Sequence, residues 1–375
     1  MRALNPGSPG SGTGMKKSGK ILPKTQGDLA RLAGVTRVTV NKALAGHASV
    51  NSETRERICL LARELGYRPN AAARAMVTRQ SKAIGALLIN TDPAFRLYNL
   101  TTYEIILGIN ARLQEDGYLL NLVNVADLGD DTGRQSRVFT EHLVDGLIAI
   151  GRIPDAISRH VQEMPVPCIW ADGNTWSAEH CIRRDERQAA ALAVDELVRL
   201  GYREIVFFGS PTLSGPDMHY SMVDRHEGAR SAALERGLPF REMLLDRDDA
   251  AAWEPGRFKK ILSKTTGIVT GDAVFARRLS DLAVLHWGLK AGLDYGMDCC
   301  DDSRMILQFY PQLCRVSFSR FDLGFKAGEM MLDCLRQPEP LCPSQKLSGQ
   351  WISGETAQKQ PVAAARTAAG TGRGR

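Results

Sequence analysis

Residues 25–76 contain the most informative pattern in the chain, and they read TQGDLARLAGVTRVTVNKALAGHASVNSETRERICLLARELGYRPNAAARAM. Apolar residues recur at helical spacing through residues 26–33, and Gly34 supplies the left-handed residue that commonly ends a helix. Thr36 is a favourable N-cap for a second helix over residues 37–44. The pattern therefore predicts two short helices joined by a tight turn.

The second predicted helix has one apolar and one polar side. Val40, Ala43 and Leu44 fall on the side that faces inward. The side chains predicted to point outward are Arg37, Val38, Asn41 and Lys42. Such a helix suits the major groove of DNA, where base edges carry the donor and acceptor code. Asn51 then opens a third, amphipathic helix, which Gly66 closes.

Charge is unevenly distributed along the 375 residues. Residues 1–81 hold 14 Lys and Arg against 4 Asp and Glu, although the whole chain has a net charge of only +6. The remainder of the chain is therefore mildly acidic. This asymmetry favours nucleic acid as a partner of the N-terminal part alone.

Three consecutive blocks extend the match beyond a generic helix-turn-helix. DLARLAGVTRVTVNKAL, VNSETRER and LGYRPNAAARAM strongly resemble the lactose-repressor (LacI-type) family of bacterial transcription regulators. The resemblance implies that a dimer binds a near-palindromic operator in double-stranded DNA. The residues expected to contact the major groove or the phosphates are Thr36, Arg37, Val38, Thr39, Asn41, Lys42 and Asn51.

A short alanine-rich segment follows the third helix. Pro69 ends that helix, and Asn70 can cap a new one. In the resembling family this hinge helix folds when two subunits meet over DNA and enters the minor groove. The matching residues here are Met76 as the apolar wedge and Ala73 beside it, and Met is an acceptable wedge between base steps. The alternative is an ordinary interdomain linker with a helical tendency.

From Lys82 onward, buried strand patterns alternate with helical ones. AIGALLIN, YLLNLVNV, LIAIG, VPCIWAD, EIVFFG and GIVTG read as strands, separated by amphipathic helical runs such as RQAAALAVDELVRLG. This order predicts a parallel α/β architecture, long enough for two doubly wound subdomains. In the resembling family these are the two lobes of a periplasmic-binding-protein-like effector domain with a small ligand between them.

The chain is therefore expected to divide into five parts. They are a disordered basic leader (1–20), a helix-turn-helix domain (21–68), a hinge helix and linker (69–81), a two-lobed effector and dimerisation domain (82–356) and a disordered tail (357–375). The tail from Pro361 shows no apolar heptads, so a homodimer is expected rather than a tetramer held by a coiled coil.

Ligands of open α/β sheets bind at the carboxyl ends of strands, which narrows the candidates for effector contacts. By position and by resemblance these are Asp92, Phe95, Asp185, Arg225, Trp253 and Asp272. Carboxylates and a guanidinium can satisfy paired hydroxyls while an aromatic ring covers an apolar face, so the set favours a sugar or sugar acid. The alternative is that Asp92 only makes a turn before Pro93 and that Trp253 packs on the surface.

Two departures from the family pattern affect these expectations. Asn41-Lys42 stands where a Ser-Arg pair is usual, and Lys cannot contact guanine in the bidentate manner of Arg. The stretch Asp298-Cys299-Cys300-Asp301-Asp302 reads about four residues shorter than the family's buried strand. We expect from this a thinned second lobe and an altered or empty effector site.

Other classes of protein are disfavoured by what the sequence lacks. No signal peptide or membrane-spanning run is present, and eight cysteines without metal-ligand spacing indicate free thiols, so a cytoplasmic protein is expected. No nucleophile elbow, metal-spaced histidines or dinucleotide fingerprint indicates an enzyme, and no cofactor is expected. A regulator that has lost ligand control and a cytoplasmic solute-binding module remain as alternatives.

Overall fold

The computed structural model describes residues 25–67, 80–88, 100–125, 137–141, 143–210, 218–246, 249–302, 312–337 and 342–360. The chain divides into two compact units, Met1–Gln80 and Ser81–Arg375, and each is described by itself. Asn70, Ala73, Met76, Asp92 and Phe95 lie outside the described residues.

The first unit contains the three predicted helices. They are α1 (Gln26–Ala33), α2 (Arg37–Leu44) and α3 (Ser52–Glu64). Gly34 ends α1 with φ of 65°, a conformation that glycine adopts without a Cβ clash. One small core joins the helices, and it includes Leu29, Val40 and Ile58, each 0% exposed. The sequence prediction of a helix-turn-helix followed by a third helix is confirmed.

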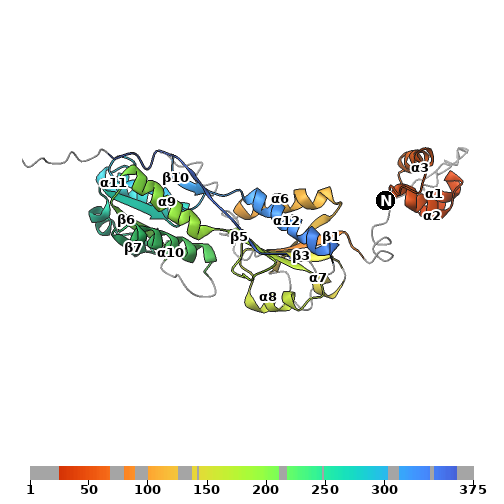
Figure 1. Cartoon of the computed structure of the whole chain (residues 1–375), viewed down its shortest axis with the longest axis horizontal. Helices are drawn as coiled ribbons and strands as arrows, with labels where there is room; N and C mark the ends of the chain where they lie inside the picture. Colours follow the sequence, from red (N-terminus) through yellow and green to blue (C-terminus); the bar gives the residue numbers. More distant parts are fainter. Residues whose placement is uncertain are drawn as a thin grey trace, which may run out of the picture. The chain divides into compact units, whose positions relative to one another are not determined.

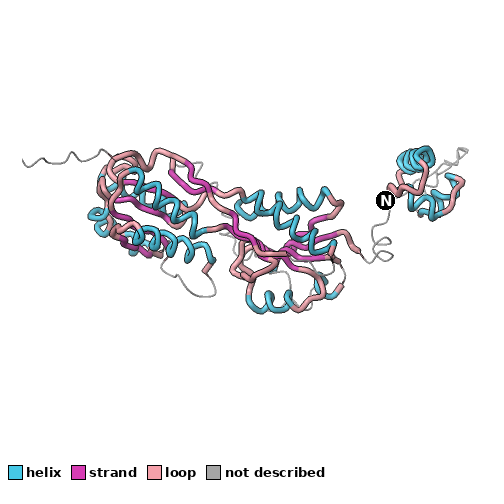
Figure 2. The backbone as a smooth tube through the Cα atoms, in the orientation of Figure 1, coloured by secondary structure: helices cyan, strands magenta, loops and turns pink. Residues whose placement is uncertain are grey.

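The second unit contains two six-stranded sheets, each enclosed between helices (Figures 1 and 2). The first sheet has the order β11-β5-β4-β3-β1-β2, and all its strand pairs are parallel. Its strands are β1 (Ala83–Leu88), β2 (Leu119–Asn124), β3 (Gly146–Ile150), β4 (Cys168–Ala171), β5 (Cys181–Arg184) and β11 (Gln345–Leu347). Its helices are α6 (Leu100–Glu115), α7 (Arg137–Thr140), α8 (Asp155–Gln162) and α12 (Arg320–Arg336).

Figure 1 shows α6 and α12 together on one side of the first sheet and α8 on the other. Two glycines allow α6 and α12 to pack closely. A Cβ at Gly108 would lie 2.0 Å from the carbonyl oxygen of Phe321, and one at Gly324 would lie 2.0 Å from that of Ile105. Because both obstacles are backbone atoms, neither side can yield by changing a rotamer.

The second sheet has the order β12-β10-β9-β8-β6-β7, and only the β10–β12 pair is antiparallel. Its strands are β6 (Glu204–Gly209), β7 (Phe240–Leu244), β8 (Thr266–Thr270), β9 (Gly296–Cys299), β10 (Cys314–Ser317) and β12 (Gln350–Ile352). Its helices are α9 (Glu186–Leu200), α10 (Tyr220–Glu235) and α11 (Ala273–Trp287), with short 3-10 turns at Ala250–Trp253, Pro255–Arg257 and Lys259–Ile261.

The expectation that the short stretch near Cys299 thins the second lobe is wrong. Strand β9 is present, fully buried, and hydrogen-bonded between β8 and β10. It has only four residues, and one of them is the carboxylic acid Asp298, so its pattern does not resemble the usual apolar strand. The second lobe is therefore complete in its six strands.

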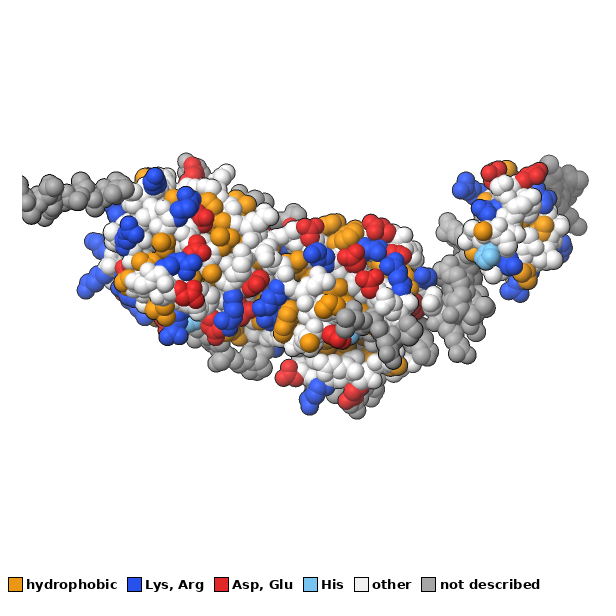
Figure 3. All heavy atoms as spheres, viewed as in Figure 1, with side chains coloured by type: hydrophobic (Ala, Val, Ile, Leu, Met, Phe, Trp, Pro, Cys, Tyr) orange, Lys and Arg blue, Asp and Glu red, His pale blue; other side chains and the backbone are white. Residues whose placement is uncertain are grey.

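The chain passes between the two lobes three times, from β5 to α9, from β10 to α12 and from β11 to β12. Each lobe is consequently built from segments that are distant in sequence. On the face shown in Figure 3, Lys and Arg side chains lie among Asp and Glu side chains over the second unit. No helix in the described part of the chain is long and apolar enough to cross a bilayer.

Candidate DNA interface and effector cleft

Side-chain caps fix the start of each helix in the first unit. The hydroxyl of Thr36 accepts from the backbone N–H of Thr39 at 3.1 Å, which sets the start of α2. The side-chain oxygen of Asn51 accepts from the N–H of Thr54 at 2.9 Å and does the same for α3. These caps give Thr36, Thr39 and Asn51 a structural role on the surface where phosphate contacts are proposed.

Helix α2 presents the residues that the sequence places outward. Arg37, Asn41 and Lys42 are exposed, and Val38 is 63% exposed, whereas Val40 and Ala43 are buried. The side-chain oxygen of Asn41 accepts from Gln26 Nε2 at 3.3 Å, which ties α2 to α1. This is a short rigid helix with one side free to donate to and accept from base edges and to contact a thymine methyl group.

In the second unit, two of the predicted effector residues, Asp185 and Asp272, lie between the end of a strand and the start of a helix. Asp185 is the N-cap of α9, and its carboxylate accepts from the N–H of Gln188 at 3.2 Å. Asp272 is the N-cap of α11 and accepts from the N–H groups of Val274 and Phe275 at 2.9 and 3.1 Å. Both carboxylates are half-buried.

Trp253 does not have the predicted environment. It is 3% exposed, lies in the core of the second lobe and stacks on Phe275 with a centroid distance of 5.9 Å. The guanidinium of Arg278 lies 4.7 Å from the ring centroid, and the indole N–H donates to the carbonyl of Asp246 at 2.9 Å. The ring therefore has no open face for a sugar in this structure. Trp253 is a packing residue, as the alternative had it, but it packs in the core and not on the surface.

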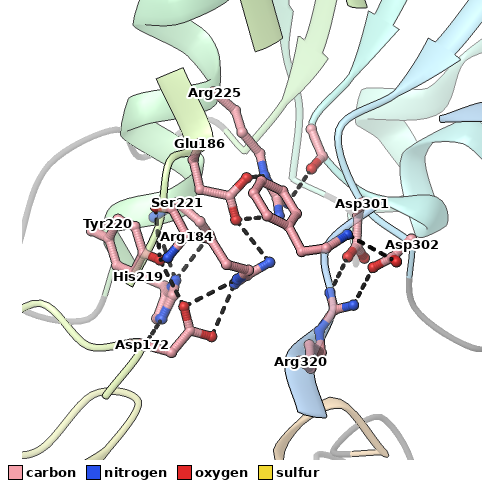
Figure 4. A network of polar contacts seen from close by, with 12 residues as sticks. Asp172, Arg184, Glu186, His219, Tyr220, Ser221, Arg225, Asp301, Asp302 and Arg320 are labelled. Atoms are coloured by element: carbon pink, nitrogen blue, oxygen red, sulfur yellow. Dashed lines mark hydrogen bonds and ion pairs between the residues drawn. The ribbon is translucent and has the colours of Figure 1, made fainter. Parts of the chain in front are cut away.

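Arg225 of α10 does lie near Asp272, because its Nη1 donates to the carbonyl of the preceding residue, Gly271. Its main partner, however, is a residue that the sequence does not single out. Glu186 accepts from Arg225 Nε at 2.7 Å and from Nη2 at 2.8 Å (Figure 4). Glu186 is 0% exposed and Arg225 3%.

The same network extends to the first lobe through Arg184, the last residue of β5 (Figure 4). Its guanidinium lies 2.7 Å from Glu186 and pairs with both carboxylate oxygens of Asp172 at 3.0 and 3.1 Å. Asp172 also accepts from the hydroxyl of Tyr220 at 2.6 Å. Since Asp172 follows β4 and Tyr220 begins α10, these contacts join the two lobes directly.

Two further contacts cross between the lobes. Asn174 donates to the carbonyl of Met218 and accepts from the N–H of Tyr220, both at 2.8 Å. At the start of α12, Arg320 pairs with Asp301 at 2.8 Å and with Asp302, the two acids that follow β9.

Burial and charge pairing compete in this network. Burial raises the pKa of Asp172, but the electrostatic interactions with Arg184 and His219 and the hydrogen bonds from Arg184 and Tyr220 together outweigh burial and bring that pKa to about 2. Burial lowers the pKa of His219, although Asp172 opposes this shift. The Asp172–Arg184 pair is consequently charged, and His219 is neutral, at neutral pH.

The network residues that the sequence prediction omits are Asp172, Arg184, Glu186, His219, Tyr220, Asp301, Asp302 and Arg320. One signal could have identified part of this set. Asp172 directly follows the apolar strand β4, at the carboxyl edge of a sheet where polar residues collect. The partners on helices carry no such mark.

The helix-turn-helix unit and the two-lobed α/β unit together define a DNA-binding transcription regulator with an attached binding domain. Three family models match the chain in this order. "Bacterial regulatory proteins, lacI family" covers residues 25–70, "Periplasmic binding proteins and sugar binding domain of LacI family" covers 81–252, and "Periplasmic binding protein-like domain" covers 194–357. The chain belongs to the LacI-type family of bacterial transcription regulators.

Similar proteins span most of the chain. Catabolite control protein A of Priestia megaterium is 28% identical over 324 residues, covering 81% of this chain and 90% of that protein. The HTH-type transcriptional regulator CelR of Thermobifida fusca is 26% identical over 317 residues, again covering 81% and 90%.

Solved structures share the fold. The lac repressor dimer bound to operator and the anti-inducer ONPF has a TM-score of 0.70 at 21% identity, covering 90% of this chain and 99% of that one. A complex of CelR with cellobiose has a TM-score of 0.60 at 20% identity, covering 89% and 99%.

Proposed function

We propose that this regulator is a repressor that binds a near-palindromic operator as a homodimer and changes its affinity when a sugar or sugar acid binds between its lobes. The observation that carries the DNA-binding part is α2. Caps fix its start, Val40 and Ala43 are buried beneath it, and Arg37 and Lys42 are exposed on its outer side. Arg37, Val38, Asn41 and Lys42 would contact base edges, and Thr36, Thr39 and Asn51 would contact phosphates.

The hinge remains part of the proposal. Asn70, Ala73 and Met76 would form the segment that enters the minor groove, with Met76 as the wedge between central base steps. Domain limits at residues 20, 68, 81 and 356 belong to the same proposal. A purely regulatory role in the cytoplasm, without catalysis, completes it.

The effector part is supported by two observations. Arg225, Asp185 and Asp272 gather near strand ends of a two-lobed domain, where open α/β sheets bind ligands. Related regulators have been solved with ONPF and with cellobiose. Asp92 and Phe95 would add contacts from the first lobe. Closure of the lobes around a ligand would shift the dimer between arrangements of different operator affinity.

A regulator without ligand control is the second candidate, and one observation favours it. The three guanidinium groups of the interlobe network, those of Arg184, Arg225 and Arg320, are already paired with carboxylates of the chain itself. Of these pairs, the one between Arg320 and Asp301 joins the lobes, so the chain itself supplies a charged contact between them.

Selection from a library of randomised DNA duplexes tests the main proposal. The full chain should enrich a sequence with two-fold symmetry, and sugars added to the bound complex should change its dissociation constant. Enrichment of no common sequence would refute operator binding. Enrichment without any response to sugars or sugar acids would favour the second candidate.

A further inference from the structure

Glu186, the first residue of α9, accepts from the same two donors of Arg225 that the carboxylate or phosphate of a ligand would need. The two carboxylate oxygens accept from Nε and Nη2 of Arg225 at 2.7 and 2.8 Å, which is the bidentate arrangement typical of arginine with carboxylates. Glu186 is 0% exposed, so water does not compete for it. The pair is therefore a fixed element of the buried network near the connection between the lobes.

The remaining N–H donors of Arg225 do not form a second pair that could bind an anion in bidentate fashion. Nη1 donates to the carbonyl of Gly271, and the residue is 3% exposed. An anion could use this guanidinium in bidentate fashion only by displacing Glu186. Displacement would break the bidentate pair and leave the buried Glu186 carboxylate with Arg184 as its remaining cation, which is unfavourable.

The other two arginines of the network do not substitute for Arg225. Arg184 pairs with Asp172 at 3.0 and 3.1 Å, and Arg320 pairs with Asp301 at 2.8 Å and also with Asp302. These three arginines face four carboxylates, those of Asp172, Glu186, Asp301 and Asp302. With His219 neutral, the network carries one negative charge in excess, so a ligand anion would add a second uncompensated charge.

This negatively charged network lies where a ligand of the two-lobed domain is expected to bind. Gly271 directly follows β8, Asp301 lies just beyond β9, and Glu186 begins the helix that follows β5. These points lie at the carboxyl ends of strands and next to the crossing between the lobes, where ligands of open α/β sheets bind.

We propose that Glu186 sets the charge class of the effector: by occupying Arg225 it excludes ligands that carry a carboxylate or phosphate and leaves the cleft selective for neutral polyhydroxylated molecules. The proposal rests on the proposed function and narrows its effector from sugars and sugar acids to neutral sugars and polyols. A neutral ligand can still donate its hydroxyl groups to the carboxylates of the network without displacing an ion pair.

The test uses the full chain and Glu186→Gln, which keeps the size of the side chain and removes its charge. Binding is measured by calorimetry and thermal shift at constant ionic strength, with three probes that differ in charge: D-glucose, D-gluconate and inorganic phosphate. The wild type should bind neither anion above a chloride control. Glu186→Gln should bind gluconate or phosphate at least about tenfold more tightly, because the released guanidinium of Arg225 can then make a charge-assisted hydrogen bond to the anion.

Glu196→Gln is the matched control, since Glu196 lies on the same helix and pairs with Arg199 at 2.7 Å away from the network. It should behave as the wild type. The proposal is overturned if the wild type binds gluconate or phosphate more tightly than glucose, or if folded Glu186→Gln binds neither anion. If the variant does not fold, tighter binding of gluconate or phosphate than of glucose by the wild type would still overturn the proposal. Loss of operator preference in the wild type would instead refute the proposed function.

Discussion

Asp298 provides a sharp test of the packing described for the second lobe. It lies in the middle of β9 and is 0% exposed. Its Oδ2 accepts from the indole N–H of Trp351 at 2.6 Å, while Oδ1 has no hydrogen-bond partner among the described residues. Burial raises the pKa of this carboxyl from its ordinary 3.8 to about 7.

The direction of the pH effect follows from this raised pKa. Because the folded-state pKa exceeds the unfolded one, folding favours the protonated acid, and wild-type stability falls as pH rises from about 4 to about 7. Asp298→Asn removes the charge and can still accept the bond from Trp351. The stability of the variant relative to the wild type should therefore increase by about 3 kcal/mol between pH 5 and pH 8, at 1.36 kcal/mol per pKa unit.

Denaturant unfolding followed by tryptophan fluorescence measures this difference. All five tryptophans lie beyond residue 81, so the signal reports the second unit alone. Asp281→Asn is the control, because Asp281 is an exposed carboxylate paired with Arg277 at 2.9 Å. Its effect should be small and nearly independent of pH. A relative stability of Asp298→Asn that changes by less than about 1 kcal/mol, or that decreases with pH, would refute a buried carboxylate in β9.

Three further predictions concern the other contacts. Gly324→Ala should lower the free energy of unfolding by roughly 1–3 kcal/mol, because its Cβ would meet the backbone of Ile105; unchanged stability would contradict the close packing of α6 on α12. Asn174→Ala should speed amide hydrogen exchange at Tyr220, whose N–H it leaves unpaired, and unaltered exchange there would argue against the interlobe contact. Arg37→Ala should weaken binding to a selected operator by roughly 1–3 kcal/mol at fixed salt, with a smaller effect on a scrambled duplex. Equal losses on both duplexes would assign Arg37 to phosphate contact instead.

The helix-turn-helix could be predicted residue by residue because its determinants are local. Thr36 and Asn51 cap helices within three residues of their partners, and Gly34 ends one through its own backbone conformation. The alternation of strands and helices in the second unit is equally local. These features correctly indicated the fold class and the buried side of α2.

The interlobe network could not be predicted because its partners are distant in sequence. Glu186 and Arg225 are 39 positions apart, and Asp172 and Tyr220 are 48 apart. The sequence identified Arg225 as a cation near the cleft but could not show that an internal carboxylate holds it.

Two other errors have a similar origin. Trp253 was predicted to contact the effector from its position and the family resemblance, yet Phe275, which packs on it, comes from a different element of the chain. The short strand β9 escaped prediction because Asp298 interrupts its apolar pattern, and hydrogen bonds to β8 and β10 maintain it. In both cases the tertiary environment, and not the local pattern, determines the role.

The proposed function depends on recognition of a specific DNA sequence by the first unit. Its most direct test is the ratio of dissociation constants of the full chain for the duplex enriched by selection and for a scrambled duplex of equal length, measured at one salt concentration. A sequence-specific regulator should show a ratio of about 10³ or more. A ratio near one, with both affinities falling equally as salt rises, would show that the exposed basic helix only neutralises phosphates and would contradict the claim.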